Sequence, residues 1–134
     1  MKITAPDIDV LARTVYGEAR GESDLGKLAV AWVVVNRAKR AHIGLAAACL
    51  KSIHFSAWNN GRGNDANQLA MLTADLSDPV FARCMAAALQ AAHGFGKDPT
   101  DGARHYHAFG VSPGWAEGRD YTTIGGHRFY KGIS

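Results

Sequence analysis

The sequence has little cysteine and no long apolar run. Its two cysteines, Cys49 and Cys84, are too few for a disulfide scaffold and too far apart for a zinc-ribbon pair, so folding needs no oxidising compartment. The longest apolar run, residues 28–35, falls far short of the ~20 residues that cross a bilayer. Residues 1–10 contain two aspartates where a signal peptide needs its apolar stretch. We therefore expect no membrane insertion and no export signal.

A strong charge of one sign is also lacking. The 15 basic residues exceed the 12 acidic ones only slightly, and they are scattered apart from Arg37, Lys39 and Arg40. These three are expected to end a helix, where cations interact favourably with the helix dipole. The mild excess would suit a polyanion such as the bacterial wall, but it does not predict nucleic-acid binding. With 47% hydrophobic and 20% charged residues, the 134 residues fit one compact domain, residues 1–134.

The chain is predicted to be helical up to about residue 97. Over residues 28–35 the sequence is apolar on every face of a helix, which predicts a central helix buried on all sides. Good caps precede two helices: Ser23 with Asp24, and Asp78 with a proline after it. The expected helices cover residues 7–20, residues 24–40 including the buried run, residues 45–50, residues 67–76 and the segment from Pro79 to about His93.

The rest of the chain favours strands and loops. Residues 105–109 and 126–130 are short aromatic runs separated by a Gly/Pro-containing loop, and they could pair as a small antiparallel sheet. Residues 56–67 are rich in turn formers and are interpreted as an exposed loop. The predicted fold class is α+β, predominantly α.

One carboxylate stands out as a candidate for chemistry. Glu18 follows Leu11 by seven residues and Val15 by three, so it projects from the edge of the apolar stripe of the first helix. Partial desolvation of a carboxyl group raises its pKa and suits a general acid in sugar-chain cleavage. The alternative is an exposed residue paired with a neighbouring cation such as Arg20. Glu22 lies after Gly21 and is interpreted as structural, serving the start of the next helix.

Histidines and loop aromatics form two further groups. On a strand, His105 and His107 would point to the same face, and with His127 they could hold zinc, although aromatic strands lining a saccharide cleft explain the same residues. Tryptophan rings and an asparagine in loops could bind sugars, or the tryptophans could anchor those loops to the core. The candidate substrate-binding residues are Ser56, Trp58, Asn59, His105, Tyr106, His107 and Trp115.

Signals for other chemistries are missing. The GRGND segment lacks the preceding strand and the lysine of a phosphate-binding loop, and no G-x-S-x-G nucleophile elbow occurs. Neither cysteine has a histidine nearby in sequence that would activate it. Hydride, phosphoryl and acyl transfer are therefore disfavoured, and no cofactor is expected.

Several segments together carry a family resemblance. In order, ARTVYGEARGE, GKLAVAWVVVNRA, FSAWN, ARHYHAFGVSPGWA and IGGHRFY resemble the SleB-type cell-wall hydrolases over most of the chain. The resemblance implies a lysozyme-like helical domain with a small sheet beside a cleft, acting on peptidoglycan glycan strands. The first glutamate of GEARGE, Glu18, would be the catalytic acid. The family's chemistry is usually lytic transglycosylation, in which one glutamate acts twice, and no metal or cofactor is implied.

Three alternatives stay open. A muramidase would use Asp65, Asp101 or Asp120 to activate water, and carboxylate separation decides between these routes. A zinc amidase using the three histidines would cut the peptide stem, and a silent wall-binding module would keep the aromatic loops without chemistry. Because the chain begins almost at the catalytic helix, we expect a bare catalytic domain. We expect it to be a monomer that acts at the bacterial wall and is suited to a phage-related setting.

Overall fold

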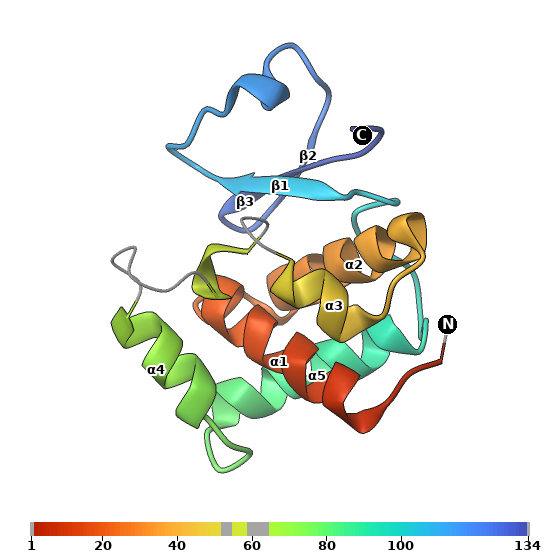
Figure 1. Cartoon of the computed structure of the whole chain (residues 1–134). Helices are drawn as coiled ribbons and strands as arrows, with labels where there is room; N and C mark the ends of the chain where they lie inside the picture. The colour runs from red at the N-terminus through yellow and green to blue at the C-terminus, as the bar shows by residue number, and fades with distance from the viewer. Residues whose placement is uncertain (1, 52–54, 59–64, 134) are drawn as a thin grey trace.

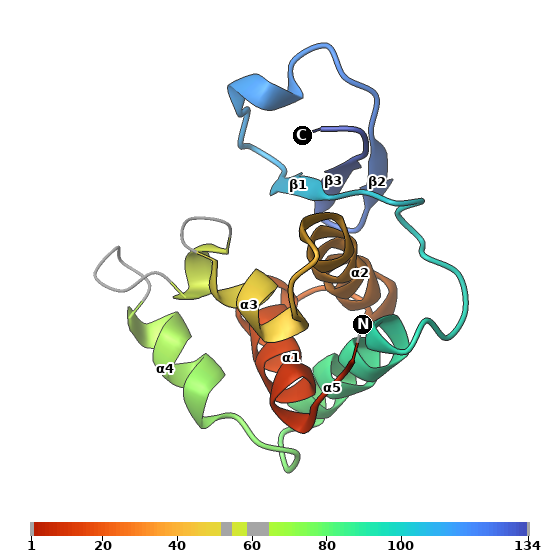
Figure 2. The same cartoon turned by 45° about the vertical axis from the view of Figure 1, so that its right-hand side comes forward.

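The computed structural model describes residues 2–51, 55–58 and 65–133. Helices form one layer and a small sheet with its loops forms a second layer, stacked on the first (Figure 1). Figure 2 shows the same two layers from another side, with the sheet next to α2. The elements are α1 (Ala5–Ala19), α2 (Asp24–Ala41), α3 (Leu45–Leu50), η1 (Ser56–Trp58), α4 (Asp65–Thr73), α5 (Pro79–Ala92), β1 (His105–Ala108), η2 (Gly114–Ala116), β2 (Thr122–Ile124) and β3 (His127–Tyr130).

Helix α1 begins two residues before its predicted start because Thr4 caps it. The Thr4 hydroxyl accepts from the backbone N–H of Asp7, and the Asp7 carboxylate accepts from the Thr4 N–H, which makes a capping box. The same carboxylate also accepts from the N–H of Ala46 at 3.0 Å, so it ties α1 to α3. Leu11 and Val15 on the inner face are fully buried. The predicted apolar stripe is confirmed.

Helix α2 is the buried central helix that the sequence predicted. The Ser23 hydroxyl accepts from the N–H of Gly26 at its start, and all residues from Ala29 to Val35 are buried. The helix ends at His42, which has a left-handed conformation with φ of 56°. Helices α1, α2 and α5 pack on one another to form the main core. None of the described helices has the length and apolar character of a membrane-crossing segment.

The last helix of the core, α5, has the predicted cap. The Asp78 carboxylate accepts from the N–H of Val80, and Pro79 occupies the first turn. Helix α4 is displaced from its predicted bounds of 67–76, because Asp65 and Ala66 join its first turn and the chain leaves the helix after Thr73. Both cysteines are buried and free, and burial raises the pKa of Cys49 to about 12. A thiol held protonated in this way is inert.

The sheet has three antiparallel strands in the order β1-β3-β2. The predicted pair β1 and β3 is confirmed, with Tyr106 opposite Phe129 and His105 opposite Tyr130. Strand β2 was not predicted, because it has only three residues within a segment rich in loop formers. Residues that face each other across a pair share one side of the sheet. One side therefore carries Tyr106 and Phe129 and packs on the helices; we call it the inner face, and the opposite side the outer face.

Candidate active site

Glu18 lies in the last turn of α1, where this helix meets η1 and the inner face of the sheet. Its two carboxylate oxygens accept hydrogen bonds from different parts of the chain. Oε2 accepts from the backbone N–H of Ala57 at 3.0 Å, and Oε1 accepts from the hydroxyl of Tyr106 at 2.6 Å. The side chain is therefore fixed in position by one donor from η1 and one from β1.

The backbone donor reaches Glu18 because α1 has a glycine at the contact. A Cβ atom on Gly17 would lie 2.7 Å from the Ala57 Cβ and 2.7 Å from the Met71 Sδ, so only glycine lets η1 and α4 approach this closely. Trp58 donates its indole N–H to the Thr14 hydroxyl at 2.8 Å, which fastens η1 to α1. The interpretation of residues 56–67 as an exposed loop is therefore wrong at Ala57, which is 1% exposed.

Tyr106 provides the second donor from a closely packed position. Its ring lies 5.5 Å from the Phe129 ring and meets the edge of His127 at 5.1 Å. Burial and the adjacent Glu18 charge together raise the pKa of Tyr106 well above its usual value. The phenol therefore keeps its proton over the whole physiological range and remains a donor to Glu18.

Arg37 places a positive charge near Glu18. Its Nε donates to the carbonyl of Arg104 at 2.5 Å, and its guanidinium lies 4.9 Å from the centre of the Phe55 ring. Burial lowers the pKa of Arg37, while Tyr106 and Glu18 oppose that shift. Its Nη1 atom is buried and has no hydrogen-bond partner within the described ranges. This position of Arg37 was not predicted, because the residue looked like one of three cations that end a helix.

Glu22 is structural, but in a different way from the one predicted. Ser23 caps α2, while the Glu22 carboxylate accepts from the N–H of Gly126 at 2.9 Å in the turn between β2 and β3. A Cβ on Gly125 would lie 2.1 Å from Glu22 Oε1, so this turn requires glycine both for space and for its φ of 57°. The Glu22 side chain also lies against Gly26 in the first turn of α2, so it joins the start of this helix to the sheet.

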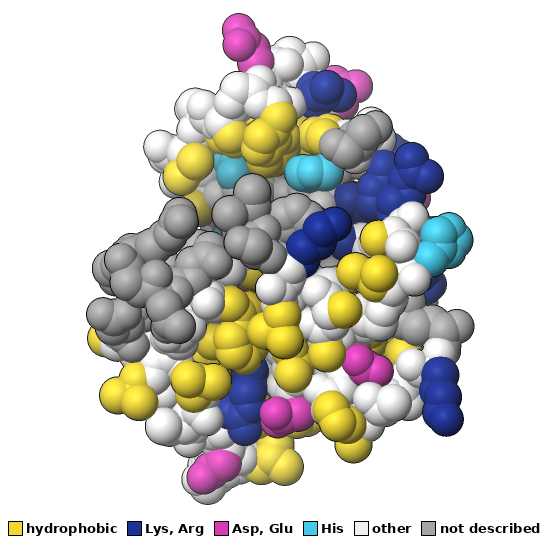
Figure 3. Space-filling view, viewed as in Figure 1, with side chains coloured by type: hydrophobic (Ala, Val, Ile, Leu, Met, Phe, Trp, Pro, Cys, Tyr) yellow, Lys and Arg dark blue, Asp and Glu magenta, His cyan; other side chains and the backbone are white. Residues whose placement is uncertain are grey.

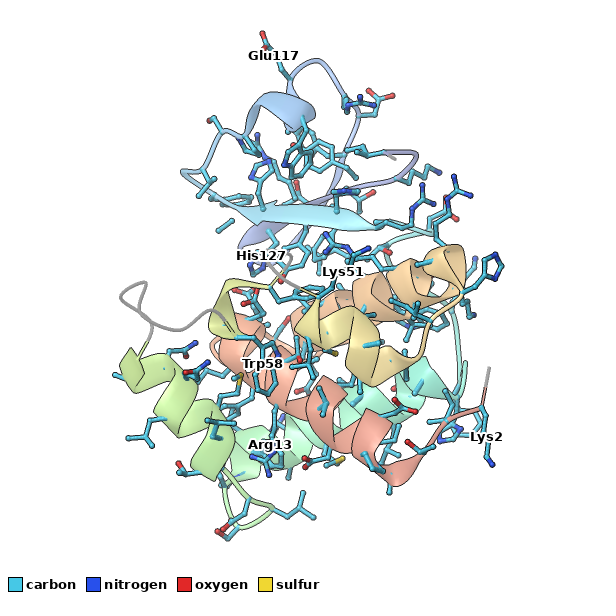
Figure 4. The ribbon with its side chains drawn as sticks, in the orientation of Figure 1. Lys2, Arg13, Lys51, Trp58, Glu117 and His127 are labelled. Atoms are coloured by element: carbon cyan, nitrogen blue, oxygen red, sulfur yellow. The ribbon has the colours of Figure 1, made fainter. Side chains whose placement is uncertain are left out.

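His127 lies beside this junction, on the side of the sheet that faces the helices (Figure 4). Its Nδ1 is 3.9 Å from Glu22 Oε1. Burial lowers the pKa of His127, although the charges of Glu22 and Glu18 oppose the shift. The side chain is therefore neutral at neutral pH and shares the inner face with Tyr106.

The other two histidines of the predicted group lie on the outer face. His107 Nε2 is 2.8 Å from the Tyr130 hydroxyl, and its ring stacks on Tyr130 at 5.3 Å. The Trp115 ring covers both histidines, 5.3 Å from His105 and 5.8 Å from His107. The zinc hypothesis is wrong, because the strand register places His127 on the opposite side of the sheet from His105 and His107. No cluster of three metal-ligating side chains occurs among the described residues.

The remaining predicted residues are distributed around the site. Asn59 lies outside the described residues, as does the side chain of Ser56, whose backbone belongs to η1. Asp101 pairs with Lys131 at 2.6 Å on the surface, and Asp120 is exposed. The side chain of Asp65 is also outside the described part. Within that part, neither Asp101 nor Asp120 forms a hydrogen bond with the group around Glu18.

A pocket of about 480 Å³ opens between the helices and the sheet, next to Tyr106. Its polar lining consists mainly of the cations Arg37, Arg40, Lys51 and Arg104. Figure 3 shows Lys and Arg side chains gathered between the two layers, and Figure 4 shows Lys51 in that position. His105 and Trp115 also line this pocket, so the structure brings these two candidate residues close to Tyr106, although from the outer face.

Comparisons with known proteins identify the family. A family model described as cell wall hydrolase matches residues 21–130. A spore cortex-lytic enzyme of Halalkalibacterium halodurans is 32% identical over 127 residues, which are 92% of this chain and 34% of that protein, so the chain spans about a third of that relative. The family-model match begins three residues after Glu18.

Two solved structures are similar over almost the whole chain. The catalytic domain of the Bacillus cereus SleB protein has a TM-score of 0.75 and 30% identity, covering 97% of this chain and 93% of that one. The catalytic domain of the germination-specific lytic transglycosylase SleB from Bacillus anthracis has a TM-score of 0.73 and 30% identity, covering 96% of both. Unlike the family model, these matches are long enough to include most of α1.

Proposed function

The chain belongs to the cell wall hydrolase family, and on that premise we propose that it cleaves peptidoglycan glycan strands between N-acetylmuramic acid and N-acetylglucosamine as a lytic transglycosylase. Glu18 acts first as the acid and then as the base. The observation that carries this proposal is the carboxylate of Glu18, held by the Tyr106 hydroxyl and the Ala57 N–H beside a pocket between the two layers.

The reaction needs two proton transfers, and Glu18 takes part in both. Protonated Glu18 gives its proton to the glycosidic oxygen, and the bond from that oxygen to C1 of the muramic acid breaks as an oxocarbenium-like centre develops. The resulting carboxylate is stabilised by the two hydrogen bonds that it accepts. It then takes the proton of the C6 hydroxyl of the same sugar, whose oxygen closes on C1 to form the anhydro ring. Water does not take part.

A single carboxylate fits this route better than hydrolysis. A hydrolase needs a second carboxylate to activate water or attack the sugar. The other acidic side chain at this junction, Glu22, already accepts from Gly126 and lies against Gly125. The relative from Bacillus anthracis is itself named a lytic transglycosylase. The muramidase route becomes the favoured one if the products carry free reducing ends.

We assign the substrate-binding roles in two groups. Tyr106 orients Glu18, and His105 and Trp115 provide the pocket wall on the sheet side. We assign Trp58, whose indole is anchored to Thr14, to the η1 side of the site, and Ser56 and Asn59 stay predictions from the sequence. His107 has an indirect role, because its ring contacts the Trp115 ring on the outer face and supports it there.

The family acts on the cell wall, and we place this chain's action there. A monomeric state remains a prediction from the sequence. A phage-related setting remains a prediction from the sequence.

Mass spectrometry of fragments released from purified peptidoglycan tests the proposal. Wild type should release anhydro-muramic ends, and Glu18→Gln should lower kcat by at least about 100-fold, the usual contribution of a general acid. The matched control is Glu22→Gln, four residues away, which should lower thermal stability and leave the product unchanged. If Glu18→Gln kept wild-type turnover while folded, the assignment of Glu18 would fall. Free reducing ends would instead favour hydrolysis.

A further inference from the structure

The pocket beside Tyr106 has an unusual charge balance. Arg37, Arg40, Lys51 and Arg104 line it, and no aspartate or glutamate is among the lining residues that the structure describes. In the described ranges none of these four cations forms a salt bridge, although four ion pairs occur elsewhere. Four positive charges around one pocket repel one another, and a bound anion would offset that repulsion.

Two of the four cations are held in place without being neutralised. Arg37 donates Nε to the carbonyl of Arg104, and Arg104 donates Nη2 to the carbonyl of Ile133 at 3.0 Å. Both acceptors are neutral backbone groups, so the full charges remain. A buried Nη1 of Arg37 is left without an acceptor in the described structure. Leaving a buried donor without an acceptor costs free energy, so an additional acceptor near this guanidinium would be favourable.

We propose that this pocket binds free carboxylates of the peptide stem carried by the muramic acid that Glu18 acts on. The inference rests on the proposed function. The stem is attached through the lactyl group of that same sugar, and Tyr106 connects the two places, since its hydroxyl binds Glu18 and its side chain lines the pocket. The stem peptide of the bound sugar therefore has to extend past only one side chain, that of Tyr106, to reach the pocket.

The size and chemistry of the pocket favour a peptide over a phosphate polymer. Guanidinium groups bind planar carboxylates in a two-pronged geometry. The walls also include Ala41, Ile43 and Ala48, which suit aliphatic parts of a short peptide, and the volume of about 480 Å³ is that of a small-ligand site. A phosphate polymer would need a basic track along the surface and not a pocket next to the catalytic group.

Two substrate preparations test this proposal. Glycan strands with stem peptides, freed of phosphate polymers, are compared with the same strands after their carboxyl groups have been amidated. Loss of charge-assisted contacts should lower kcat/KM of wild type by about tenfold on the amidated strands. Raising the salt concentration should reduce this preference, because it screens the charges at the pocket mouth.

A charge-matched pair of variants locates the effect. Arg40→Gln with Lys51→Gln removes two exposed pocket cations, and kcat/KM on unmodified strands should fall by about tenfold while the distinction between the two preparations disappears. Lys2→Gln with Lys97→Gln removes the same charge outside this pocket and should keep the wild-type preference. Circular dichroism and melting curves confirm that both variants are folded.

Each outcome bears on one proposal. Equal cleavage of both preparations by wild type overturns the carboxylate pocket and leaves the proposed function standing. The carboxylate pocket is also overturned if the Arg40 and Lys51 variant keeps the preference for unmodified over amidated strands. If the variant loses activity only when phosphate polymers are present, the cations bind those polymers instead. If wild type cleaves neither preparation, the proposed function fails. Co-sedimentation with the two strand preparations then tests the carboxylate pocket by binding alone. Stronger binding to unmodified strands that is lost in the Arg40 and Lys51 variant supports the pocket. Equal binding to both preparations overturns it.

Discussion

The two faces of the small sheet use similar residues for different purposes. On the inner face, Tyr106 and His127 meet the helices, and the tyrosine hydroxyl binds Glu18. On the outer face, Tyr130 and His107 bind each other under Trp115. Each face pairs a tyrosine with a histidine, yet only the inner-face tyrosine contacts Glu18, the proposed catalytic acid. The side of the strand on which a residue lies, and not its residue type, therefore decides whether it can contact Glu18.

The largest contrast is expected between two tyrosines that lose only their hydroxyl groups. Tyr106→Phe removes a hydrogen bond to a charged group, worth about 1.5–3 kcal/mol, so kcat should fall by about 10- to 100-fold. Tyr130→Phe removes the hydroxyl bound to His107, and its main effect should be a loss of about 1 kcal/mol in the free energy of unfolding. Turnover on purified peptidoglycan and urea unfolding measure the two quantities. Equal kcat losses would mean that both faces take part in catalysis.

Two glycines with positive φ give the next contrast. Gly125 has φ of 57° and its missing Cβ faces Glu22 Oε1, whereas Gly118 in the loop on the outer side has φ of 71° and open space around it. Gly118→Ala should cost about 1 kcal/mol of stability, the cost of a left-handed conformation. Gly125→Ala adds a steric clash and should cost about 2–4 kcal/mol. Thermal and urea melts would contradict this interpretation if both variants lost the same stability.

The smallest effect concerns pH and the inner-face histidine. Burial lowers the pKa of His127 in the folded protein below its ordinary value of 6.5. As the pH falls below 6.5, His127 is therefore protonated in the unfolded chain before it is protonated in the folded protein. Its contribution to stability is therefore complete above pH 6.5 and is lost as the pH falls towards the folded-state value. In His127→Gln, melting temperatures measured on both sides of pH 6.5 should differ less than in wild type. An unchanged difference would show that His127 does not titrate in this way.

Much of the helical layer could be predicted from local signals. The apolar spacing around Leu11 and Val15 placed Glu18 at the edge of the buried stripe, and the Asp78 cap with Pro79 fixed the start of α5. Periodicity and caps depend on residues a few positions apart, so the sequence displays them directly. The family, too, was identified from motifs, and the comparisons confirm it.

The site itself could be predicted only in part. The donor from η1 is a backbone N–H, and nothing about an alanine at position 57 reveals it. The charge of Arg37 on α2 is near Glu18 on α1 only because these two helices pack together. Strand alternation put His105 and His107 on one face, but the packing of the sheet decided that this face is the outer one. These facts depend on contacts between distant segments, which local patterns do not encode.

The separation of the parts of the site along the chain has a consequence for biosynthesis. Glu18 receives one hydrogen bond from a residue 39 positions later and another from a residue 88 positions later. Contacts this distant form only after the intervening chain has been made and folded. A ribosome-bound fragment ending before Tyr106 therefore contains the acid without its phenolic donor. Synthesis from the N-terminus thus makes Glu18 long before the groups that hold its carboxylate, and the proposed active site is completed only after Tyr106 has been translated and the sheet has packed on α1.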